Sequence, residues 1–150
     1  MTLVFSTKLP YSMHWVFSKL NKEMFEALQP PNFLAKIESY GGEQVGDTVC
    51  VFLRGIRQKM KVRISERRLT ENHCYFVDRG EVLPLGLSAW QHKHHVYKHG
   101  ENQSILTDEI FLDHPSIVGR YLSFAVVKLF LVLRSFQYRI YFKKSWKSSK

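Results

Sequence analysis

The stretch WQHKHHVYKHGENQSILTDEIFLDHP, from Trp90 to Pro115, decides the fold class because it holds two periodic segments joined by a turn. Apolar and polar residues alternate in both segments, and this period of two is typical of half-buried strands. Residues 99–103, HGENQ, supply the glycine and polar side chains of a hairpin loop. We therefore expect an antiparallel hairpin, with a helix beginning after Pro115.

The first strand of this hairpin divides its histidines between two faces, since successive side chains of a strand point to opposite sides. His95 falls on one face with lysine, glutamine and tyrosine. The opposite face is the more apolar one, and we assign it to the interior. It carries Trp90, His92, His94 and Val96.

The loop length predicts how the two strands pair. If residues 99–103 close the hairpin so that Tyr97 lies opposite Ile105, then His94 lies opposite Asp108. Side chains paired in this way are within reach of one another across the strands. The sequence therefore predicts that a histidine and an aspartate meet inside the protein.

Three interpretations of this pair remain open. His92 and His94 could supply two ligands to zinc or iron and Asp108 a third, but nothing else completes the set, so we predict no metal and no cofactor. Asp108 could instead orient His94 as an acid–base couple, as a cyclase or dehydratase requires. We favour a buried polar pair that satisfies its own hydrogen bonds and contacts a ligand or water, with no catalytic residue.

The rest of the chain extends the hairpin into a larger sheet. Residues 2–9 alternate as a first strand, and helical spacing follows before the prolines at 30 and 31. From Asn32 the period of two returns for about six consecutive strands. One of them places Lys59, Lys61, Arg63 and Arg67 on a solvated face, opposite Met60, Val62 and Ile64.

Residues 116–144 have helical spacing and are apolar nearly all round in the middle. Such a helix must be buried on more than one side or lie in a membrane. The apolar part, residues 121–133, is shorter than the roughly 20 residues that cross a bilayer, and it contains Lys128. We expect no transmembrane segment, but an α+β fold in which a curved antiparallel sheet of about seven strands wraps around this helix.

This element order resembles the SRPBCC superfamily of START-like and pollen-allergen-like helix-grip proteins. The resemblance is sharpest in a motif of Trp-x-His-x-His-x-apolar, a turn, Leu-x-Asp-x-apolar, and a proline before the last helix. Its positions here are Trp90, His92, His94, Val96, Leu106, Asp108, Ile110 and Pro115. The resemblance implies a hollow between sheet and helix for a lipid, sterol or polyketide-like molecule, and it does not by itself imply catalysis.

We therefore predict a protein that binds a hydrophobic or amphipathic small molecule. Its main rival is a polyketide cyclase or dehydratase that uses His94 and Asp108 as its acid–base pair. Lys128 would meet an anionic headgroup or point to solvent. The predicted ligand-binding residues are Met60, Val62, Ile64, Trp90, His92, His94, Asp108, Tyr121, Phe124 and Lys128.

A basic helical tail is predicted at about 134–150, within a single domain of residues 1–150. Of the 22 lysine and arginine residues, eight lie in residues 114–150, which have no acidic residue. The tail is a solvated helix end or an anionic-membrane contact, and nucleic acid is the least favoured partner. The membrane contact would use Arg139, Lys143, Lys147 and Lys150.

The two cysteines, Cys50 and Cys74, cannot form a disulfide framework or a four-cysteine zinc site. The N-terminal residues have no basic segment ahead of an apolar run, as a secretory signal would. Both features favour a reduced, cytoplasmic setting.

Overall fold

The computed structural model describes residues 1–149 and contains one antiparallel sheet of seven strands in the order β1-β7-β6-β5-β4-β3-β2. The strands β2 to β7 each pair with their neighbours in sequence, and β1 pairs with β7 at one edge of the sheet. The elements are β1 (Thr2–Leu9), α1 (Met13–Ser18), α2 (Lys22–Leu28), β2 (Ala35–Tyr40), β3 (Thr48–Leu53), β4 (Gln58–Leu69), β5 (His73–Val82), β6 (Ala89–Lys98), β7 (Ser104–Asp113) and α3 (Ile117–Ser148).

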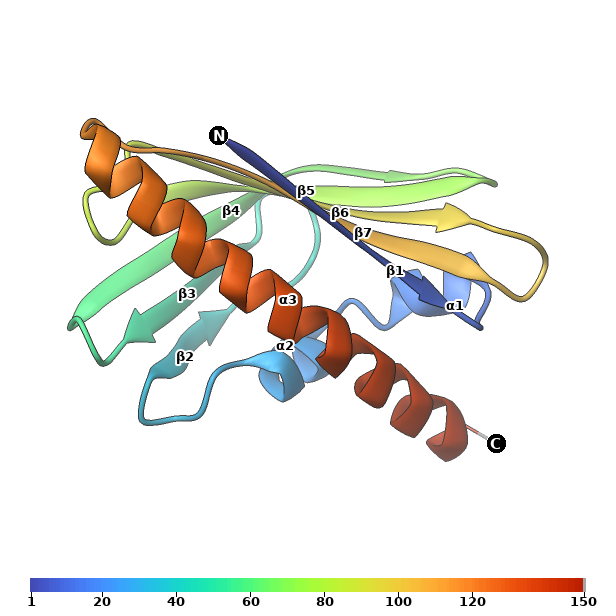
Figure 1. Cartoon of the computed structure of the whole chain (residues 1–150). Helices are drawn as coiled ribbons and strands as arrows, with labels where there is room; N and C mark the ends of the chain where they lie inside the picture. The colour runs from blue at the N-terminus through green and yellow to red at the C-terminus, as the bar shows by residue number, and fades with distance from the viewer. Residues whose placement is uncertain (150) are drawn as a thin grey trace.

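The sheet curves around one side of α3, which crosses its inner face diagonally and packs against β1, β7 and α2 (Figure 1). Ser116 begins this helix, because its side chain accepts a hydrogen bond from the backbone N–H of Gly119. The basic segment that follows residue 134 continues the same helix as far as Ser148. The predicted helix-grip architecture is therefore confirmed.

The apolar core consists of two separate clusters. The first joins α1 and α2 to the C-terminal third of α3, and its members include Val16, Phe76, Val96, Leu106 and Phe142. The second lies under the N-terminal half of α3. It contains Leu3, Ile110, Leu112 and Leu131, with the half-buried Phe5, Leu87, Trp90, Phe124 and Val127 packed against it. Polar side chains occupy the inner positions between the two clusters along β5, β6 and β7.

One expectation about α3 is wrong, because the helix is buried on one face only. Leu131 and Tyr138 face the sheet and are 3% and 1% exposed. The opposite face carries an apolar row at alternating spacings of three and four residues, which we call the outer stripe, and its side chains are between 40% and 70% exposed. It consists of Leu122, Val126, Leu129, Leu133, Phe136 and Ile140.

Two other features of the chain bear on its surroundings. Within residues 1–149, none of the helices is both long enough and apolar enough to cross a lipid bilayer. Arg67 departs from the predicted solvated row, because the pairing of β4 with β5 shifts between Ile64 and Glu66. That bulge turns Arg67 to the inner face, where its guanidinium lies 4.9 Å from the ring centre of Phe17.

Candidate functional site

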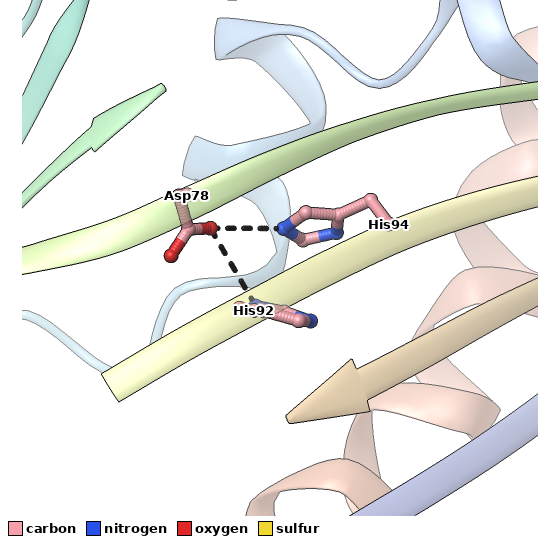
Figure 2. Close-up of side chains that lie close together, drawn as sticks. All are labelled: Asp78, His92 and His94. Carbon is pink, nitrogen blue, oxygen red and sulfur yellow. Dashed lines mark hydrogen bonds and ion pairs between the residues drawn. The ribbon is translucent and has the colours of Figure 1, made fainter. Parts of the chain in front are cut away.

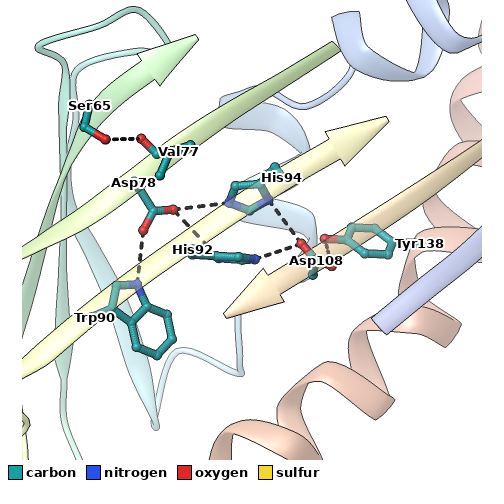
Figure 3. Close-up of polar contacts among 8 residues, drawn as sticks. All are labelled: Ser65, Val77, Asp78, Trp90, His92, His94, Asp108 and Tyr138. Atoms are coloured by element: carbon teal, nitrogen blue, oxygen red, sulfur yellow. Dashed lines mark hydrogen bonds and ion pairs between the residues drawn. The ribbon is translucent and has the colours of Figure 1, made fainter. Parts of the chain in front are cut away.

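The candidate site is built on the central strands β5, β6 and β7. Tyr97 pairs with Ile105 and His94 with Asp108, so the predicted register of the hairpin is confirmed. On the other side of β6, His92 pairs with Asp78 of β5. The two histidines therefore lie between two aspartates, one from each neighbouring strand (Figure 3). Tyr138 reaches this group from α3, and we call the five residues the polar layer.

Hydrogen bonds and ion pairs together link all members of the polar layer (Figure 3). His92 Nε2 donates to Asp108 Oδ1 at 2.8 Å, and His94 Nε2 donates to Asp78 Oδ2 at 3.2 Å. The Tyr138 hydroxyl donates to Asp108 Oδ2 at 2.9 Å. Trp90 Nε1 donates to Asp78 Oδ1 at 3.1 Å. Each carboxylate oxygen therefore has a donor within the protein, as buried charged groups require.

The predicted contact between His94 and Asp108 is present but is not the main hydrogen bond of either residue. His94 Nδ1 lies 3.2 Å from Asp108 Oδ1, within ion-pair distance. The direction of this contact is too poor for a hydrogen bond, and His94 Nδ1 is a buried atom with no hydrogen-bond partner. Asp108 instead accepts its shortest hydrogen bond from His92.

The electrostatics of the site favour two ionised carboxylates. Burial opposes the ionisation of Asp108, but the hydrogen bond from His92 and the close approach of both histidines outweigh it and hold its pKa well below the usual range. Burial likewise opposes the ionisation of Asp78, and the hydrogen bond from His94 helps to lower its pKa. Both aspartates therefore carry negative charge at neutral pH.

The two histidines are shifted in opposite directions. Burial disfavours the charged form of His94, but the carboxylates of Asp108 and Asp78 outweigh it and raise its pKa. For His92, burial and the neighbouring charge of His94 lower the pKa despite the bond to Asp108. Arg134 adds a second cation near the polar layer, and the nearby Tyr138 and carboxylates raise its pKa against the effect of burial. His94 and Arg134 thus place positive charge beside the two carboxylates.

Three of these residues also meet the geometric requirement for binding a metal ion. Asp78, His92 and His94 each offer one ligand atom, and these atoms lie within 4.8 Å of one another (Figure 2). Asp78 thus takes the third position, for which the sequence offered Asp108. Asp108 lies on the far side of the imidazole rings, where it receives a hydrogen bond from His92.

The other predicted ligand-binding residues lie at different depths. On β4, Ile64 is buried, whereas Met60 and Val62 are half-buried on the same inner face. On α3, Phe124 packs against the second apolar cluster. Tyr121 is 62% exposed, and Lys128 is also exposed. Neither side chain points toward the sheet, in contrast to their predicted place in the ligand site. Tyr121 and Lys128 precede Leu131 by ten and three residues. Because neither spacing completes a whole number of helical turns, both side chains lie at the edge of the helix face that carries Leu131.

Two surface pockets lie away from these residues. The larger, of about 520 Å³, is lined by Lys8, Leu9, Pro10, Tyr11, Gln103, Arg139 and Lys143. The smaller, of about 140 Å³, is lined by Ser12, Met13, His14, Glu71, Lys98 and Glu101. No predicted ligand-binding residue contributes to either pocket.

Sequence reasoning missed Asp78, Tyr138 and Arg134. For Asp78 a signal exists, since it follows Cys74 and Phe76 at alternate positions and so continues the inner face of β5. For Tyr138 the spacing of seven residues from Leu131 places it on the same helix face. The sequence does not show which point of the sheet lies under that face.

Comparison with known proteins agrees with this architecture. No family model matches the sequence, and no curated protein sequence matches it. Among solved structures, norcoclaurine synthase from Thalictrum flavum, in complex with dopamine and hydroxybenzaldehyde, matches with a TM-score of 0.68 and 13% identity over 95% of this chain and 87% of its own. The Zhui aromatase/cyclase from Streptomyces sp. R1128 matches with a TM-score of 0.60 and 12% identity over 92% and 90%.

An uncharacterized protein from Bacillus thuringiensis also matches, with a TM-score of 0.59 and 14% identity over 91% of this chain and 96% of its own. These identities are low, so the similarity is one of fold. The chain therefore has the helix-grip fold, which does not by itself determine a function.

Proposed function

We propose that this protein binds a hydrophobic or amphipathic small molecule between the inner face of the sheet and the N-terminal half of α3. The observation that carries the proposal is a set of inward-facing apolar side chains that stay half-buried. Trp90 and Phe124 approach from opposite layers, beside the buried Leu131. Met60 and Val62 extend this apolar surface along β4.

A ligand in this position would complete the burial of these side chains. Removal of apolar surface from water contributes roughly 25 cal/mol per Å² before the costs of association. The polar layer lies next to the second apolar cluster, where Trp90 joins the two through its bond to Asp78. A mostly apolar site with a few fixed polar groups is the usual composition of small-molecule sites.

The binding test uses 1-anilinonaphthalene-8-sulfonate as a fluorescent probe and palmitic acid as its competitor. Val62→Trp fills the inner face of β4 and should weaken probe binding about tenfold, which corresponds to about 1.4 kcal/mol. Val4→Trp is the matched control, because Val4 is 59% exposed on β1 and the same bulk is added away from the inner face.

The outer stripe could also bind the probe, so the titration is repeated with Leu129→Glu/Leu133→Glu. Probe binding that survives this double variant and is lost in Val62→Trp supports the inner site. Equal affinity in the wild type and Val62→Trp, or failure of palmitic acid to displace the probe, contradicts it.

The acid–base alternative has weaker support. Catalysis by His94 and Asp108 requires a group that can reach a substrate, yet Asp108 already accepts bonds from His92 and Tyr138 and is 3% exposed. His94 is 7% exposed and has its Nε2 bonded to Asp78. We therefore assign the polar layer a binding and structural role first.

A second function is favoured by the outer stripe of α3. We propose that this face docks on an anionic membrane surface. The apolar stripe ends at Ile140, and Lys143 and Lys147 continue the same helix face at spacings of three and four residues. Arg139 flanks it, whereas Lys150 lies outside the described residues. Apolar side chains beside lysine and arginine are the composition of helices that lie in the membrane interface.

Charge favours a membrane over a second copy of the chain as the occupant of the stripe. Residues 114–150 have eight basic and no acidic residues, so two α3 helices brought together would repel one another. An anionic lipid surface instead attracts each basic side chain, with about 1 kcal/mol per residue near the surface.

The membrane test compares sedimentation with vesicles of phosphatidylserine and phosphatidylcholine against vesicles of phosphatidylcholine alone. Binding should require the anionic lipid, fall at high salt and be lost in Leu129→Glu/Leu133→Glu. Val4→Glu/Phe111→Glu is the control, since it makes the same charge change at exposed positions of the sheet. A stripe-dependent dimer without vesicle binding would contradict the proposal and identify a second copy as the occupant.

A further inference from the structure

We propose that Asp78, His92 and His94 form a binding site for a divalent transition-metal ion of the Zn²⁺ or Fe²⁺ class. The inference concerns the polar layer alone and does not depend on the binding of an apolar ligand. Two imidazoles and one carboxylate are a ligand set that proteins use for both metals.

The two histidine ligand atoms lie at distances from the aspartate oxygen that are close to those around a metal ion. His94 Nε2 and His92 Nδ1 lie 3.2 Å and 3.7 Å from Asp78 Oδ2 (Figure 2). Two ligands bound tetrahedrally at about 2.0–2.1 Å from an ion are about 3.3–3.4 Å apart. The two distances to Asp78 Oδ2 lie on either side of this value, and all three ligand atoms lie within 4.8 Å of one another, so side-chain movements would bring them around an ion.

The remaining nitrogen of each histidine faces the same carboxylate. His92 Nε2 bonds Asp108 Oδ1 at 2.8 Å, and His94 Nδ1 lies 3.2 Å from the same oxygen. Metal-bound histidines characteristically donate their other N–H to a carboxylate, which fixes the ring and increases its basicity. Asp108 meets this requirement for His92, and it lies within ion-pair distance of the free Nδ1 of His94. The Tyr138 hydroxyl holds the carboxylate in place.

Asp78 is oriented in a similar way. Trp90 Nε1 donates a hydrogen bond to Asp78 Oδ1 at 3.1 Å, and this bond leaves Oδ2 directed at the two histidines. In this arrangement His92 donates from Nε2, so the neutral ring presents an unprotonated Nδ1 to a carboxylate oxygen that it cannot donate to. A cation between Nδ1 and Oδ2 converts this unfavourable contact into two favourable ones.

The ion would also balance the charge of the buried aspartates. Asp78 and Asp108 are 7% and 3% exposed and together bring two negative charges into the interior. A divalent cation on neutral histidines would bind Asp78 directly and lie across the imidazole rings from Asp108, where it would replace the proton of His94 as the countercharge. Three protein ligands leave at least one coordination position for water or a small molecule, which is the pattern of catalytic rather than purely structural zinc sites.

The test is a titration of the chelator-treated full chain with Zn²⁺ alone, followed by calorimetry, and with Co²⁺, followed by its visible absorption. We expect one ion per chain, a Co²⁺ spectrum with nitrogen and oxygen ligands, and a higher unfolding temperature with Zn²⁺. His92→Gln/His94→Gln should lower the affinity at least 100-fold. Asp108→Asn should retain one ion per chain and lower the affinity about 10- to 100-fold.

The control is His73→Gln/His95→Gln, which removes the histidine pair on the opposite face of the same sheet. His73 Nε2 and His95 Nδ1 lie 2.9 Å apart, so this pair is the main competitor for an added ion. Zn²⁺ binding that is lost in this control and kept in His92→Gln/His94→Gln overturns the proposal, as does the absence of binding to the wild type. If His92→Gln/His94→Gln does not fold, Asp78→Asn provides the same comparison, and the far-ultraviolet circular dichroism of each variant is recorded first.

Discussion

The two faces of β6 hold histidines that are neighbours in sequence and differ in almost every physical property. On the inner face His92 and His94 are buried between Asp78 and Asp108. On the outer face His95 contacts His73 and lies in a row of aromatic rings with Tyr97. The difference shows that strand alternation, more than residue type, decides which histidines join a buried charged network.

The largest effect should come from removing the carboxylate that both inner histidines approach. Asp108→Ala leaves His92 and Tyr138 without their acceptor and leaves a positive charge uncompensated, so the free energy of unfolding should fall by about 3–5 kcal/mol. Urea denaturation measures this loss.

The neighbouring residue supplies the control for this change. Glu109 lies on the outer face of β7 and pairs with Lys93 at 2.8 Å, where both side chains are one-third exposed. Glu109→Ala should cost less than about 1 kcal/mol, as is usual for surface ion pairs. Comparable losses in the two variants would mean that the inner and outer faces do not differ as described.

Tyr138→Phe should have an intermediate effect. The substitution removes only the hydroxyl that donates to Asp108 at 2.9 Å, so a buried carboxylate oxygen loses one donor. We expect the free energy of unfolding to fall by about 1–3 kcal/mol. Tyr97→Phe on the outer face of β6, where the side chain is 38% exposed, should change it by less than about 0.5 kcal/mol. Thermal unfolding of both variants at one protein concentration measures the difference, and equal stabilities would argue against Tyr138 as a support of Asp108.

Much of this contrast could be predicted from local sequence. The alternation in residues 90–98 assigns each histidine of β6 to a face. A short hairpin loop then fixes the register that brings His94 opposite Asp108. Both inferences are local, because the period of a strand and the length of a short loop leave few alternatives.

The rest of the site depends on contacts that are distant or irregular. Asp78 reaches β6 across residues 83–88, an irregular connection in which Leu85 and Gly86 have positive φ and whose length does not fix the register. It also lies beside the bulge between β4 and β5. The same bulge turns Arg67 inward. The position of Tyr138 depends on where α3 crosses the sheet. Both faces of α3 are apolar, so the sequence did not indicate which of them packs against the sheet. Sequence therefore predicted the fold and three of the five residues of the polar layer.

The smallest loss of stability should come from replacing the outer histidines, because this change tests the outer face of β6 and leaves the polar layer intact. His73 stacks on Tyr97 with ring centres 4.3 Å apart, so His73→Gln/His95→Gln removes aromatic contacts but no buried charge. Such contacts contribute about 0.5–1.5 kcal/mol, and partial exposure places the expected loss of unfolding free energy near the lower value. His92→Gln, one substitution on the inner face, should cost more than this double variant, because Asp108 then loses the donor at 2.8 Å. Chemical denaturation of the two proteins compares them directly. If the outer double variant is the less stable one, the stability of β6 comes from its aromatic face, and the polar layer is maintained for binding alone.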